Sequence, residues 1–116
     1  MKNEKWKMES SIKDLTLVEI RAAQAEIAGK MDNSQLSKAD QRNLEKASLH
    51  LRNLERSMVN SVENTLVAEL KNESSALKEL VEEINKTSAQ LFKITEILGK
   101  VVSTTGQLID VLAKVV

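Results

Sequence analysis

The chain has 116 residues, and its 17 basic and 17 acidic side chains cancel to a formal net charge of zero. It has no cysteine and no proline, three glycines and two aromatic residues, Trp6 and Phe92. No disulfide, thiol nucleophile or sulfur-ligated metal site is therefore possible, and the neutral charge argues against nucleic acid as the main ligand. Because few residues interrupt a helix and the aromatic residues that favour strands are almost absent, the composition predicts an all-α fold.

We expect a first helix over residues 4–29. Gly29 follows a run of good helix formers and is typical of a C-cap, and the residues after it are turn-like in composition. The apolar side chains of this helix fall on more than one face, and its alanines permit close approach to another helix. One stripe has Ile20, Ala23, Ile27 and Met31, and the other has Met8, Ile12, Leu15, Val18, Ala22 and Ala25.

We expect a second helix over residues 37–72. Ser37 is a candidate N-cap, and Asp40 places an acidic group in the first turn, near the positive end of the helix dipole. The helix carries one narrow apolar stripe, and from Leu54 to Leu70 its apolar residues step by four, as a stutter would. The polar residues 72–75 favour a turn there, with one unbroken helix through residues 37–116 as the alternative.

The predicted third helix, residues 75–116, has the clearest pattern. Its apolar residues alternate three and four apart for more than five heptads, which predicts a coiled coil or helical bundle. Thr87 and Thr105 are the polar residues of this seam; each could fix the helix register or bond back to its own helix. We predict that an interface with a partner uses the seam and part of a neighbouring stripe: Leu77, Leu80, Ile84, Leu91, Ile94, Leu98, Val101, Val102, Leu108, Ile109, Leu112 and Val115.

The neighbouring stripe contains Phe92, Gly99, Val102, Gly106 and Ile109. Glycine inside a helix costs stability, so Gly99 and Gly106 predict either a kink or a close helix crossing. Two or three long helices with few large core residues make a weak core for one chain. We therefore expect an elongated bundle or coiled-coil hairpin, forming one domain over residues 1–116, that is completed by self-association or by another helical protein, with a homodimer favoured.

No catalytic, cofactor-binding or metal-ligating residues are predicted. His50 is the only histidine and has no Glu-x-x-His pairing, so it cannot form the usual zinc or di-metal set. It is expected to be a surface or interface residue. No base is placed to activate a serine, so we expect a protein that is not an enzyme and has no small-molecule substrate.

The sequence has no signal peptide and no transmembrane segment by its pattern, which predicts a cytoplasmic protein or one exported without a cleaved signal. Trp6 lies among lysines and glutamates and is expected to plug one end of the bundle. The alternative is an amphipathic anchor at a membrane surface.

These patterns predict a non-enzymatic helical interaction or scaffolding module that self-associates through the seam. In its general composition, short, helical and poor in Cys, Pro and aromatics, the chain is similar to small helical substrates, chaperones and adaptors of bacterial secretion systems and phage particles. A hetero-partner adaptor of that kind is one alternative function, and a membrane-surface protein is another. No motif in the chain carries the likeness.

Overall fold

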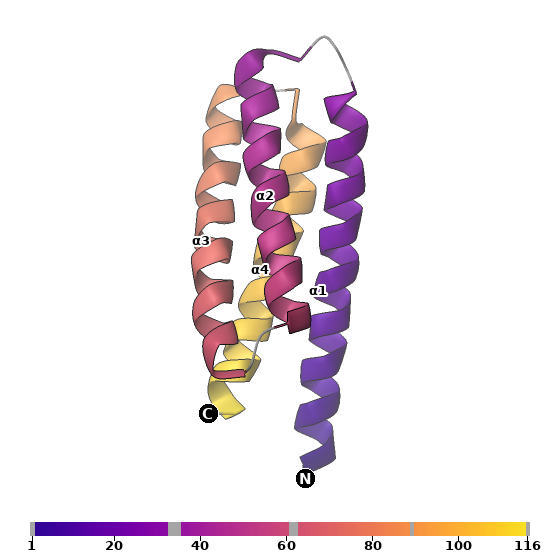
Figure 1. Ribbon diagram of the computed structural model, residues 1–116, viewed down its shortest axis with the longest axis vertical. Coiled ribbons are helices and arrows are strands. Elements are labelled where there is room, and N and C mark those ends of the chain that lie inside the picture. Colours follow the sequence, from indigo (N-terminus) through magenta and orange to yellow (C-terminus); the bar gives the residue numbers. More distant parts are fainter. Residues whose placement is uncertain (1, 33–35, 61–62, 89, 116) are drawn as a thin grey trace.

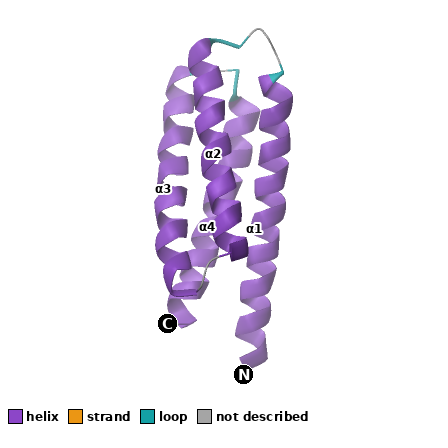
Figure 2. Ribbon diagram, viewed as in Figure 1, coloured by secondary structure: helices purple, strands orange, loops and turns teal. Residues whose placement is uncertain are grey.

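The computed structural model describes residues 2–32, 36–60, 63–88 and 90–115, with the backbone alone described for residues 2–10, 63–65 and 115. These residues form four α-helices and no strand: α1 (Lys2–Met31), α2 (Lys38–Asn60), α3 (Glu63–Thr87) and α4 (Phe92–Val115). The helices lie side by side, alternate in direction and are linked at the two ends of the bundle (Figures 1 and 2). The all-α prediction is confirmed, and the prediction of two or three long helices is wrong.

The break between the first two helices was predicted correctly. The backbone N–H of Asp40 donates to Ser37 Oγ at 3.1 Å, so Ser37 is the N-cap of α2. Gly29 is not the C-cap, because α1 continues to Met31. No glycine in the described residues has the positive φ that a left-handed cap requires.

The turn expected at residues 72–75 is wrong, because those residues lie inside α3. Ser74 is buried, and the Glu73 carboxylate accepts hydrogen bonds from α2, so packing keeps this polar segment helical. Instead, α2 ends at Asn60 and α3 begins at Glu63. The spacing by four between Leu54 and Leu70 was interpreted as a stutter within one helix, and it spans this change of helix.

The predicted helix over residues 75–116 is divided at residues 88–91. Thr87 Oγ1 donates to the Glu83 carbonyl at 2.8 Å, and Ser88 Oγ donates to Asp40 Oδ2 of α2 at 3.2 Å. Hydroxyl groups that bond locally or to another helix compete with helix continuation. The heptad spacing continues across this break because the apolar residues of the seam on α3 and on α4 face the same core.

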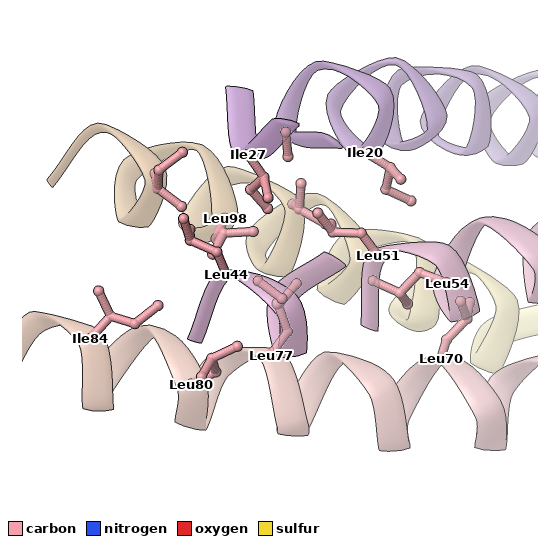
Figure 3. Packing of buried hydrophobic residues seen from close by; sticks show 14 of the residues in the cluster. Ile20, Ile27, Leu44, Leu51, Leu54, Leu70, Leu77, Leu80, Ile84 and Leu98 are labelled. Atoms are coloured by element: carbon pink, nitrogen blue, oxygen red, sulfur yellow. The ribbon is translucent and has the colours of Figure 1, made fainter. Parts of the chain in front are cut away.

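The core runs along the axis of an elongated bundle measuring 53 × 21 × 20 Å. Each helix packs against two others, in the ring order α1, α2, α3, α4 and back to α1. Figure 3 shows side chains from all four helices meeting in the centre, among them Ile20 and Ile27 of α1, Leu51 of α2, Leu77 of α3 and Leu98 of α4. The described part of the chain therefore buries the apolar seam of α3 and α4 without a second molecule.

Candidate interaction surface

The structure places the predicted seam inside the bundle. Val102 and Ile109 are partly buried against the core, and the side chain of Val115 lies outside the described residues. The other predicted interface residues are buried: Leu77, Leu80, Ile84, Leu91, Ile94, Leu98, Val101, Leu108 and Leu112. These side chains contact other helices of the same chain, so self-association through them stays a prediction that would require the bundle to open.

The two apolar stripes predicted on the first helix have different environments. Ile20, Ala23 and Ile27 are buried in the core. Of the other stripe, Ile12 is partly buried against the core. Leu15, Val18, Ala22 and Ala25 face away from the core, and we name these four residues the outer α1 stripe. Leu15 is 53% exposed and Val18 is 62% exposed, and both alanines are exposed.

The outer α1 stripe keeps the alternating three- and four-residue spacing of a helix-packing seam, although no described helix covers it. Toward the C-terminal end of α1 the surface is hollowed, with an open depression of about 460 Å³ lined by Ala25, Glu26, Gly29 and Lys30. Small side chains at this end would let another backbone approach closely. The sequence identified this stripe but could not show which of the two faced the core.

A polar contact fixes the rotation of α1 relative to α2. Arg21 donates from Nε to Glu55 Oε2 at 3.0 Å, and Gln24 donates from Nε2 to Glu55 Oε1 at 3.4 Å. Because Arg21 and Gln24 follow one side of α1, their bonds to α2 direct the outer α1 stripe away from α2. Sequence reasoning missed this contact, since Glu55 lies more than thirty positions along the chain.

The single histidine lies in a polar contact between α2 and α3. His50 Nδ1 donates to Glu73 Oε2 at 2.7 Å, and Asn53 Nδ2 donates to Glu73 Oε1 at 3.2 Å. His50 is half-buried, and its role in the described structure is to hold α3 against α2. Its partner was not identified from sequence, because residues 72–75 were assigned to a turn.

Beside this contact is an open hollow of about 380 Å³ between α2 and α3. Small-molecule sites are lined mostly by hydrophobic and aromatic side chains, whereas every residue that lines this hollow has a polar or charged side chain. Within the described ranges, His, Cys, Asp and Glu side chains form no group of three or more that could hold a metal ion. The hollow is lined by Asn53, Arg56, Ser57, Asn60, Glu69, Asn72 and Glu73.

Gly99 and Gly106, for which the alternatives were a kink or a close helix crossing, make no close crossing within the described chain. A Cβ atom added at either glycine would have no neighbour within 4 Å, so neither residue makes room for another helix of this chain. Both are half-buried positions of α4. Phe92, on the same stripe, is 64% exposed.

The side chain of Trp6, expected to plug the bundle, lies outside the described residues. In the part of the chain that the structure describes, no helix combines the length and the apolar character needed to cross a bilayer. Comparison of the chain with protein families, with curated proteins and with solved structures gives no match. The surface of this bundle is therefore the basis for inferring a function.

Proposed function

We propose that this protein is a non-enzymatic helical interaction module that self-associates as a folded four-helix bundle. The observation that carries the proposal is the exposed outer α1 stripe. Its residues have the spacing of a helix-packing seam, but no described helix packs against them. The bundle already encloses the seam of α3 and α4, so self-association through the outer α1 stripe leaves the core intact.

The arrangement of exposed apolar side chains supports this choice of surface. Single exposed apolar residues are common on soluble proteins and need no explanation. Val59 on α2 and Phe92 on α4 are of this kind. Met31 and Leu49 are neighbours, because both line one open depression between α1 and α2. The outer α1 stripe differs because four apolar residues follow one face of one helix over about three turns.

The test is the molar mass in solution, measured by light scattering on a size-exclusion column over a wide range of loading concentrations. We expect a dimer fraction that rises with concentration for the unaltered chain. Val18→Glu should raise the dissociation constant by roughly a hundredfold, because each copy would bury an unpaired carboxylate in the interface.

Val59→Glu is the matched control. Val59 is also a valine, lies on α2 and is 62% exposed, the same fraction as Val18. We expect this variant to dimerise like the unaltered chain, with circular dichroism confirming that both variants remain helical. A chain that is monomeric at every concentration would contradict self-association. Equal effects of the two substitutions would contradict the assignment to the outer α1 stripe.

A further inference from the structure

The surface around the outer α1 stripe also specifies a direction of pairing. We infer that two copies of α1 pack antiparallel along this stripe, with Leu15 facing the partner's Val18 and Asp14 facing the partner's Arg21. The inference rests on the proposed self-association and adds the direction in which the two α1 helices pair. The occupant is a second copy of this chain because the charges beside the stripe complement one another under a two-fold axis.

The apolar residues determine where the axis lies. Leu15 and Val18 are the large exposed side chains of the outer α1 stripe, and Ser11 and Ala22 extend the same spacing on either side of them. In an antiparallel pair with the axis between Leu15 and Val18, these two residues from both copies form one apolar centre. Ser11 then faces the partner's Ala22 at each end, where two small side chains let the helices approach closely.

Charge complementarity selects the antiparallel direction. Asp14 and Arg21 are seven residues apart and therefore lie on the same side of the stripe, and both are exposed. Residues that flank a helix–helix seam pair across it and set partner orientation. The proposed axis brings each Asp14 beside the partner's Arg21, giving two pairs of opposite charge. Arg21 donates from Nε to Glu55 of its own chain, and its guanidinium has further N–H donors for the partner's Asp14.

A parallel pair has less complementarity, because the offset that would set Arg21 beside the partner's Glu26 also sets like charges together. It would set Asp14 beside the partner's Glu19, and the same contact would occur twice, so four carboxylates would lie in two like-charged pairs. In the antiparallel pair Glu19 instead lies near the partner's Ile12. One carboxylate oxygen of Glu19 is already buried within its own bundle, which turns part of this charge away from the partner.

Site-directed cross-linking tests the direction, because the chain has no cysteine of its own. Ser11→Cys and Ala22→Cys are prepared as separate chains, mixed and oxidised under mild conditions. Both positions are exposed and carry small side chains, and they are about 16 Å apart along α1. We expect disulfides that join residue 11 of one chain to residue 22 of the other, identified by mass spectrometry of the digested product.

Disulfides that join only like positions, 11 to 11 and 22 to 22, would overturn the antiparallel inference while leaving self-association in place. A chain that dimerises in solution but forms no disulfide at either position would overturn the placement of the partner on this face. A chain that does not dimerise is recognised beforehand by light scattering, and that result counts against the proposed function.

Substitutions that reverse the charges of Asp14 and Arg21 test the proposed contact between them independently. Asp14→Arg alone creates two Arg–Arg contacts in the homodimer, and Arg21→Asp alone creates two Asp–Asp contacts. Each variant should dimerise with a dissociation constant roughly tenfold weaker than the unaltered chain. An equimolar mixture should regain the affinity, since its heterodimer has opposite charges at both contacts. Any loss of stability from breaking the Arg21–Glu55 bond would not be restored by mixing, so failure of the mixture to associate better would overturn the proposed contact.

Discussion

Two threonines in the bundle core differ in whether their hydroxyl groups are paired. Thr16 and Thr105 are both fully buried. Thr16 Oγ1 donates to the Ile12 carbonyl of its own helix at 2.6 Å, whereas Thr105 Oγ1 has no hydrogen-bond partner among the described residues. The sequence marked Thr105 as a polar interruption of the seam, but whether its hydroxyl finds a partner depends on neighbouring helices that spacing does not specify.

Thr105→Val should therefore stabilise the protein by about 1 kcal/mol, because it replaces an unpaired buried hydroxyl with a methyl group of similar size. Thr16→Val is the matched comparison, and it should be neutral or destabilising because it removes a hydrogen bond that is made. Urea unfolding followed by circular dichroism measures both variants. Equal stabilisation of the two would show that the pairing of the hydroxyl has no influence on stability.

The ends of the helices could be predicted from the sequence only where residues close to the helix end determine them. Ser37 caps α2 through a hydrogen bond to the N–H of Asp40, three residues away, so the sequence alone placed this helix start. The divisions at residues 61–62 and 88–91 carry no glycine or proline. The apolar spacing continues on both sides of each division, so the sequence pattern did not reveal it. Packing against other helices determines where these helices end.

The same limit applied to the candidate surface. Both stripes of the first helix have the spacing of a packed face, so periodicity identified two faces without ranking them. The structure buries the stripe that includes Ile20 and Ile27 and exposes the one with Leu15 and Val18. The difference is consistent with size, since Ile20 and Ile27 fill the space between four helices better than Ala22 and Ala25 would.

The glycines of α4 allow a test of helix propensity that is separate from packing. Gly99→Ala and Gly106→Ala should each stabilise the protein by about 0.5–1 kcal/mol, because alanine is the better helix former and the added Cβ meets no neighbour within 4 Å. Thermal or urea unfolding of the single and double variants gives the values. A loss of stability would mean that a close contact at these positions is missing from the described structure.

For the whole molecule, the central question is whether the seam is a core or an interface between chains. Leu98 is fully buried among side chains of the same chain. Leu98→Asp should therefore lower the free energy of unfolding by more than about 4 kcal/mol, with loss of helical signal, because a carboxylate would be buried without a partner.

Gln107→Asp is the control for Leu98→Asp, since Gln107 is an exposed position of the same helix, and it should change the urea midpoint little. If Leu98→Asp instead left helicity and the urea midpoint unchanged and only reduced the molar mass in solution, the seam would be the self-interface that its spacing first suggested.

The ring order of the helices has a kinetic consequence. Three of the four helix–helix interfaces in the described residues join helices that are consecutive in the chain, and the fourth joins α1 to α4. Closing a longer segment of chain costs more conformational entropy, so the α1–α4 contact is expected to form last during folding. The consecutive contacts place the protein among topologies that fold within microseconds to milliseconds. Until α4 packs against α1, α2 alone covers the stripe with Ile20 and Ile27, and that stripe is fully buried only when the ring closes.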